Sequence, residues 1–203
     1  LRPTCYRHED DDPTSLADDL VTSLWVDRRG RLWTGTDGGG LDYLDPGTSH
    51  FVHLRHDPAD PASLGHDSVL SILEDTQGTL WIGLEIAGLD RLGPDGRTFV
   101  HLRSDPSDDR MLSADTVTEV FEDRRGHFWV GTDDGGLNSL DRSSGRVTRY
   151  PPSAERVGSR GPTSVQSIFE DRAGILWVGT FGDGVARFDP ARLKFVRYHV
   201  SPD

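Results

Sequence analysis

Residues 117–132 read VTEVFEDRRGHFWVGT, and close copies of this stretch begin at residues 21, 69 and 165. Its tryptophan, Trp129, has counterparts at Trp33, Trp81 and Trp177, so the interval between copies is always 48 residues. A strict period of this length with strand-like content is typical of β-propeller blades and related stacked arrays. The repeat, more than any single residue, predicts the fold.

Each copy divides into four short strands. Residues 117–121 alternate in polarity, and in the turn 123–126 Asp can cap the backbone while Gly adopts the left-handed conformation. The second strand includes Phe128–Thr132, a glycine-rich turn leads to a third strand at 137–141, and a fourth follows at 146–150. Such an antiparallel meander is the unit of a propeller blade. We therefore predict an all-β fold of four four-stranded repeats, forming part of a larger propeller.

The repeat also predicts how the chain is divided. We expect blades at residues 19–66, 67–114, 115–162 and 163–203, and residues 1–18 match the end of a repeat whose beginning is missing. The first strands are expected near residues 19–27, 67–75, 115–123 and 163–171, with almost no helix anywhere. The alternative is a β-solenoid or a string of independent hairpins, but a 48-residue unit with four strands is too long for a solenoid rung.

The pattern of side chains suits blades packed between two neighbours. Because side chains alternate along a strand, Trp129 and Gly131 face one way while Phe128 and Val130 face the other, and both faces are apolar. The first strand has a small or polar residue in its middle, at Ser23, Ser71, Glu119 and Ser167, as expected for a crowded innermost strand beside a central channel. The repeat positions expected to carry the packing are Trp33, Trp81, Trp129, Trp177, Gly35, Gly83, Gly131 and Gly179.

These motifs resemble the two-component regulator propeller repeat of bacterial sensor proteins. The most specific stretches are residues 77–83, QGTLWIG, and residues 56–64, HDPADPASL. In that family the repeats usually build two seven-bladed propellers in an extracytoplasmic sensor region, followed by an immunoglobulin-like module, a membrane helix and a cytoplasmic output domain. Members often detect carbohydrates. The resemblance thus implies a periplasmic or extracytoplasmic ligand-sensing segment, with a small molecule or oligosaccharide as the ligand to test.

The chain departs from the family pattern at several points. It holds fewer repeats than the family supplies and contains no membrane segment, kinase motif or cyclase motif, so the output function cannot be read from it. The first copy has Val26 where the others have Glu, and the second has Leu84-Glu85 where two others have Thr-Asp.

Composition narrows the range of partners. The formal net charge is −12, with 34 acidic residues against 22 basic ones. This argues against a nucleic-acid partner, because binding the phosphate backbone requires clustered Lys and Arg. Mean hydropathy is −0.53, and no apolar run approaches the roughly 20 residues that cross a bilayer, so we expect no membrane contact by this segment. The single cysteine, Cys5, excludes an internal disulfide.

Metal, cofactor and catalytic sites are not predicted. The clusters 10–12 and 57–60 could hold Ca²⁺ through Asp oxygens, but turn capping explains them equally well. His53, His101 and His199 fall in outer strands, where a half-exposed surface role is the default. The glycine-rich turns join two strands and no helix follows, so they do not resemble phosphate loops. We predict that the chain is not an enzyme, although its many carboxylates leave a carbohydrate-active enzyme as an alternative.

A ligand-binding face can nevertheless be proposed. The turns between second and third strands share one end of the blades with the long connections, and they vary in sequence. Binding residues tend to lie on variable loops held by a rigid scaffold. Phe181 with Asp183 offers an aromatic platform beside a carboxylate, which would suit a sugar. The candidate residues are Asp37, Glu85, Asp133, Asp134, Phe181 and Asp183.

The two ends of the array carry no polar caps. Strand positions in the first and last copies are apolar, and exposed apolar patches mark association sites. We therefore expect the chain to pack against further propeller repeats or a second copy of itself. A structural interaction or self-assembling module is the alternative function to a sensor.

Overall fold

The structure is a computed structural model that describes residues 4–150, 163–190, 192 and 194–198. Within them lie sixteen strands in four sheets and no helix. The first sheet holds β1 (Val21–Val26), β2 (Leu32–Thr36), β3 (Leu41–Leu44) and β4 (Phe51–Leu54), and the second holds β5 (Val69–Glu74), β6 (Leu80–Leu84), β7 (Gly88–Leu92) and β8 (Phe99–Leu102). The third holds β9 (Val117–Glu122), β10 (Phe128–Thr132), β11 (Gly136–Asp141) and β12 (Arg146–Tyr150), and the fourth holds β13 (Val165–Glu170), β14 (Leu176–Thr180), β15 (Val185–Asp189) and β16 (Lys194–Tyr198).

The strands of every sheet pair antiparallel in chain order. The predicted all-β fold of four-stranded meanders is therefore confirmed, and β1, β5, β9 and β13 lie inside the expected first-strand ranges. The boundaries between blades stay a prediction. The expected end of the third blade, residues 151–162, lies outside the described residues, as do residues 1–3 and 199–203.

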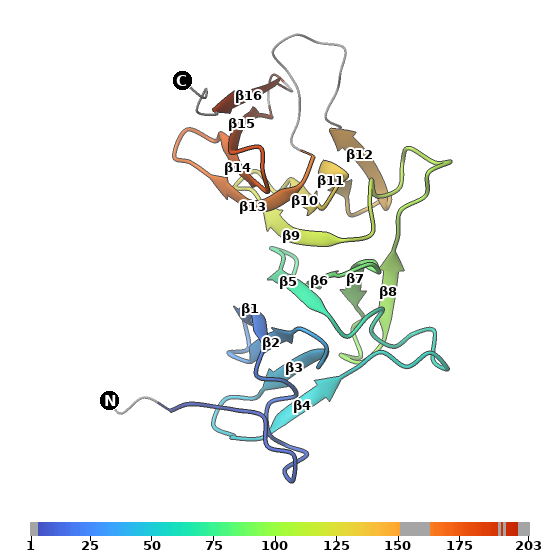
Figure 1. The fold of residues 1–203 in the computed structure, drawn as a ribbon, viewed down its shortest axis with the longest axis vertical. Helices are drawn as coiled ribbons and strands as arrows, with labels where there is room; N and C mark the ends of the chain where they lie inside the picture. The colour runs from blue at the N-terminus through green and yellow to red at the C-terminus, as the bar shows by residue number, and fades with distance from the viewer. Residues whose placement is uncertain (1–3, 151–162, 191, 193, 199–203) are drawn as a thin grey trace.

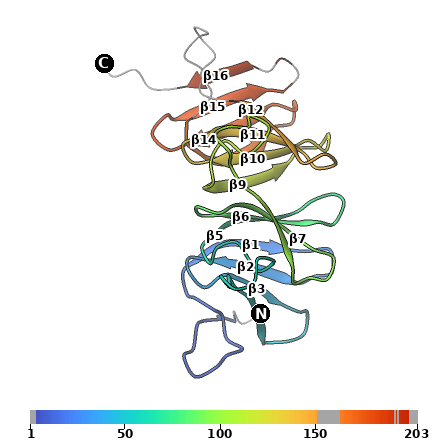
Figure 2. The same cartoon turned by 90° about the vertical axis from the view of Figure 1, so that its right-hand side faces the viewer.

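The four sheets form an open arc rather than a closed ring (Figure 1). Their first strands line the inner side of the arc, where β1 packs beside β5, β5 beside β9, and β9 beside β13. The outer strands β4, β8 and β12 lie on the side of the sheets away from these first strands, and the turned view shows the sheets stacked one on another (Figure 2). The first and fourth blades stand at opposite ends of the arc.

A hydrogen-bonded turn connects the first and second strands of each blade. In the third blade, Asp123 Oδ1 accepts from the backbone N–H groups of Arg125 and His127, each at 2.9 Å, and Gly126 has a φ of 82°. This is the predicted turn chemistry. The sequence did not predict that the Trp129 indole donates to Asp123 Oδ2, at 3.1 Å. The same bond joins Trp33 to Asp27, Trp81 to Asp75, and Trp177 to Asp171.

The long connections lie along the outer strands and are held by buried carboxylates. In the second blade, fully buried Asp90 accepts from the Gly65 backbone at 2.8 Å, and its Oδ1 lies 2.6 Å from His101 Nδ1. Burial raises the pKa of Asp90, and the bond from His101 offsets part of that rise. His53 and Asp42 repeat this arrangement in the first blade. These two histidines lie in outer strands as expected but bind buried carboxylates, while His199 lies outside the described residues.

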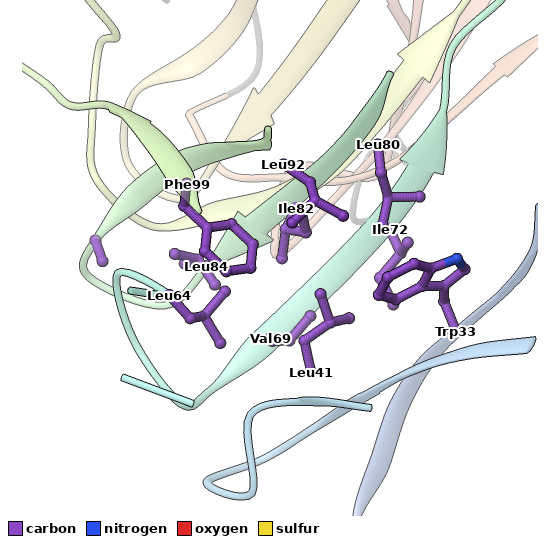
Figure 3. Packing of buried hydrophobic residues seen from close by; sticks show 11 residues of the cluster. Trp33, Leu41, Leu64, Val69, Ile72, Leu80, Ile82, Leu84, Leu92 and Phe99 are labelled. Atoms are coloured by element: carbon purple, nitrogen blue, oxygen red, sulfur yellow. The ribbon is translucent and has the colours of Figure 1, made fainter. Parts of the chain in front are cut away.

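The hydrophobic core is divided among the junctions between consecutive sheets. Figure 3 shows the cluster between the first two blades, in which Trp33 of β2 faces Ile72 of β5 and Leu80 of β6. Burying a large side chain in this way stabilises the fold by about 1.5–3 kcal/mol relative to exposure. Each blade therefore depends on its neighbour for much of its core.

The glycine two residues after the tryptophan allows the next blade to come close. A Cβ on Gly35 would lie 2.6 Å from Val69 Cγ1, and one on Gly131 would lie 2.5 Å from Val165 Cγ1. Interiors are packed too densely to absorb such overlaps without shifting a strand. In the first three blades, Gly35, Gly83 and Gly131 are thus required by packing between blades, whereas a Cβ on Gly179 would meet only Ser167 of its own blade.

Candidate ligand-binding face

The six candidate residues all lie in the turns that join second to third strands. The backbones of these turns are tied to the connection that precedes the same blade, since Asp37 N–H donates to Leu20 O at 2.9 Å and Asp133 N–H to Thr116 O at 2.9 Å. Glu85 and Phe181 make the same bond with Ser68 and Ser164. We call the end of the blades formed by turns 37–40, 85–88, 133–136 and 181–184 the loop face.

Two of the candidate residues join neighbouring blades. The carboxylate of Asp37 accepts a hydrogen bond from the Ser68 hydroxyl, and that of Asp133 accepts one from Ser164. Both serines belong to the connection that leads into the following blade. Asp37 and Asp133 therefore have a structural role at the junctions, which the sequence analysis did not anticipate.

The turn of the second blade holds a strained residue. Ile86 has a φ of 54° and is 67% exposed, next to exposed Glu85. A β-branched residue in the left-handed region is an outlier, and such strain often accompanies a functional site. The same position is glycine in the first and fourth blades, at Gly38 and Gly182, and in the third blade it is Asp134, with a φ of 64°.

Phe181 and Asp183 lie in the same turn of the fourth blade. Phe181 is 78% exposed, and Asp183 Oδ2 accepts from the Thr163 hydroxyl at 3.1 Å. Phe181 occupies the repeat position of Asp37 and Asp133. The loop face therefore presents an exposed aromatic ring and several carboxylates, but those carboxylates belong to four separate turns.

A further carboxyl lies on the inner side of the arc. Strands β1, β5 and β9 line a cavity of about 480 Å³, and Glu119 is among the lining residues. Burial raises the pKa of Glu119 to about 7. In the β9–β10 register Glu119 pairs with Gly131, next to Thr132, the last residue of β10 before the loop face. Glu119 thus lies in the half of β9 that is nearer the loop face.

Glu119 was not among the site residues predicted from the sequence. The signal was available, because Glu119 replaces a serine found at the same position in the other three blades. The Ser23 and Ser71 hydroxyls are buried without a hydrogen-bond partner and lie against Gly35 and Gly83. Crowding in the innermost strand explains why small serines occupy this position, but it does not explain the larger, ionisable side chain of Glu119.

The aspartate clusters are used as turn caps. Asp12 Oδ1 accepts from Thr14 N–H, Asp57 Oδ1 from Ala59 N–H, and Asp60 Oδ1 from Ala62 N–H, each at 2.9 Å. In the part of the chain that the structure describes, no three His, Cys, Asp or Glu side chains are grouped so that they could hold a metal ion. The described residues also include no helix long and apolar enough to span a bilayer.

Three segments of the sequence match one family model. Residues 63–85, 111–134 and 159–182 match the two component regulator propeller, each segment covering the end of a connection, a first strand and a second strand. The chain therefore contains three segments of the two-component regulator propeller type. Comparison with curated proteins gives no match.

Solved structures share the fold of these two-component regulator propeller repeats. Two extracellular domains from B. thetaiotaomicron, from proteins named as hybrid two component systems, are each 23% identical over 94% of this chain, with TM-scores of 0.77 and 0.69. This chain covers only 25% and 26% of those two chains. Virginiamycin B lyase from Staphylococcus aureus is 13% identical over 89% of this chain and 55% of its own, with a TM-score of 0.62. Since sensor and lyase share one architecture, this likeness establishes the fold alone.

Proposed function

We propose that this chain is a ligand-sensing propeller segment of a bacterial signal-transduction receptor and that it acts outside the cytoplasm. The two-component regulator propeller repeats and the likeness to extracellular domains of proteins named as hybrid two component systems support this proposal. In this role the chain binds a ligand without transforming it, and the output domain belongs to other parts of the receptor.

We place the ligand on the loop face, and one observation carries that choice. The repeat is broken there by exposed apolar residues, Ile86 and Phe181, where other blades have glycine or a carboxylate. A sugar ring can lie on such surfaces while its hydroxyls donate to carboxylates, and the exposed Glu85 and Asp134 lie on the same face. We therefore propose an oligosaccharide as the ligand.

The test is a panel of oligosaccharides titrated into the protein by calorimetry. Phe181→Ala should weaken binding about tenfold, the loss expected for an aromatic anchor. Phe169→Ala is the matched control, because Phe169 is another exposed phenylalanine of the same blade, 65% exposed, and it lies in β13, away from the loop face. Equal losses in the two variants, or no binding by any sugar, would refute the proposal. Recovery of shortened sugars after incubation would favour the enzyme alternative.

One observation favours a second candidate, a self-assembling structural module. Leu24 is 60% exposed, whereas its counterparts Ile72 and Val120 are 7% and 4% exposed because a preceding blade covers them. At the other end of the arc, Phe169 is also exposed. A chain that associates through these two faces without binding any ligand would support this second function.

A further inference from the structure

Consecutive blades are joined at the end opposite the loop face by one repeated hydrogen bond. Glu74 Oε2 accepts from Arg28 N–H at 2.8 Å, Glu122 Oε2 from Thr76 N–H at 2.6 Å, and Glu170 Oε2 from Arg124 N–H at 2.9 Å. In each case the glutamate ends a first strand, and the donor belongs to the hairpin of the preceding blade. We call this end of the blades the hairpin end.

An arginine fills the junction between the second and third blades at the hairpin end. Arg142 Nη1 lies 2.8 Å from Asp75 Oδ2 and its Nη2 lies 2.6 Å from Glu122 Oε1, and the side chain is only 12% exposed. The same repeat position in the second blade is Pro94. Proline cannot reach across to the first blade, and at this junction the structure has a cavity of about 720 Å³.

Arginines gather around this cavity. Two come from the hairpin between β1 and β2, one from β7, and one from the turn between β7 and β8: Arg29, Arg31, Arg91 and Arg97. Trp33, Leu80 and Leu92 also line it, and they belong to the hydrophobic cluster drawn in Figure 3. We call this cavity the arginine cleft.

The carboxylates that line the arginine cleft are already engaged. Asp27 accepts from the Trp33 indole at 2.9 Å and from Arg31 Nε at 2.7 Å. Glu74 accepts from the Arg28 backbone, and Asp95 caps its own turn by accepting from Thr98 N–H at 3.0 Å.

Three of the four guanidinium groups are left for a ligand. Within the described ranges, the structure has no ion pair that involves the guanidinium of Arg29, Arg91 or Arg97. Four arginines and three carboxylates line the cleft, so it carries a small local excess of positive charge in a chain whose net charge is −12.

We propose that the arginine cleft binds a small molecule carrying at least two oxyanion groups. Guanidinium groups recognise carboxylate, sulfate and phosphate through paired, charge-assisted hydrogen bonds, and three of them can hold more than one such group. The volume of the cleft lies within the range of about 300–1,000 Å³ that is usual for small-molecule sites. This site lies at the opposite end of the blades from the loop face and does not depend on the proposed sensor function.

Calorimetric titration of the chain with four probes tests the proposal. Tri-galacturonic acid carries carboxylates, a disulfated disaccharide carries sulfates, and pyrophosphate carries phosphates, while maltotriose is neutral. Because an oligosaccharide could also bind the loop face, the probes are titrated into the Phe181→Ala variant, which lacks the aromatic anchor of that face. At least one anionic probe should bind this variant and maltotriose should not, and the anionic probe that binds identifies the oxyanion. Failure of all three anionic probes would overturn the proposal.

Matched variants locate the site. Arg29→Gln should weaken binding of the anionic probe about tenfold, the loss expected for a charged hydrogen bond. Arg125→Gln should leave the affinity unchanged, because Arg125 is the exposed residue at the same repeat position two blades later and does not line the cleft. Equal weakening in the two variants would overturn the proposal. Pro94→Arg, which restores the residue type of Arg142, should also reduce binding by at least tenfold.

Discussion

Glu119 places an ionisable group where the other blades have serine. Burial raises the pKa of this carboxyl from 4.5 to about 7, so between these two values the folded chain holds a proton that the unfolded chain has released. Because the folded chain binds this proton more tightly, protonation of Glu119 contributes to the free energy of unfolding. The contribution is fully present below about pH 4.5 and is lost as the pH rises through about 7. The other carboxyl of the cavity, Glu122, is paired with Arg142.

We expect Glu119→Ser to remove this pH dependence. The variant carries the residue type of Ser71, and its unfolding temperature should exceed that of the natural chain by a margin that grows from about pH 5 to about pH 7.5. Thermal unfolding followed by circular dichroism across this range measures the margin. Glu119→Gln, which keeps the shape without the charge, serves as the control and should follow the serine variant. A constant margin in either variant would contradict the assigned pKa.

Ile86 should be a source of strain that a different side chain relieves. Asn adopts the left-handed region more readily than a β-branched residue, so Ile86→Asn should raise the free energy of unfolding by about 1 kcal/mol. Ile86→Val keeps the branched Cβ and should give no gain. Urea unfolding compares the two variants, and equal stabilities would show that this backbone conformation carries no cost.

Residue patterns predicted local bonds well and bonds between blades poorly. The Asp and Gly of each hairpin turn were predictable because their partners lie two to four residues away. The bond from Asp37 to Ser68 was not, since these residues are 31 positions apart and meet only because of how the second blade docks on the first. For this reason, Asp37 and Asp133 were predicted as ligand-binding residues although their carboxylates bind serines of the next connection.

At the scale of the strand, the tryptophan of the second strand should carry much of each junction. Trp129 is buried and packs on Tyr150 of β12 and on Phe188 of the next blade, with ring centroids 5.8 and 5.5 Å away. Trp129→Ala should lower the free energy of unfolding by about 3–5 kcal/mol, the range for truncating a large buried aromatic residue. Asp134→Gly, at an exposed turn with positive φ, should change it by no more than about 0.5 kcal/mol. Chemical denaturation measures both variants. Similar losses of unfolding free energy in Trp129→Ala and Asp134→Gly would contradict this expectation.

Strand positions were predictable, but an irregularity within the first strands was not. Alternating side chains and turn residues located all the strands, yet the pairing of first and second strands shifts register at the same place in each blade, between Val21 and Ser23 in the first. The extra residue there, Thr22, donates its hydroxyl to Val69 O of the next blade. Thr118 does the same with Val165 O, at 2.5 Å. A polarity pattern does not reveal this shift, because the extra residue differs in character from blade to blade and is Leu70 in the second and Gln166 in the fourth.

At the scale of the molecule, the uncovered faces at both ends of the arc should cause association. At each of the three junctions, the face of a blade that carries the residue equivalent to Leu24 is covered by the blade before it. Leu24 of one copy can therefore be covered by the fourth blade of a second copy. Light scattering of the 22.4 kDa chain should give a mass that rises with concentration. Leu24→Glu should keep it monomeric, while Val52→Glu, on an outer strand, should not. A monomer at every concentration would contradict this expectation.

The glutamate bonds at the hairpin end also bear on how such an array can change in length. Each joins residues 46 positions apart, so removing residues 67–114 as a block would bring the Arg28 backbone opposite Glu122, with donor and acceptor still matched. Loss or gain of part of a unit would leave a donor without its acceptor. Unequal crossing-over between copies of the repeat in a gene, which exchanges whole units, therefore yields chains that can still fold.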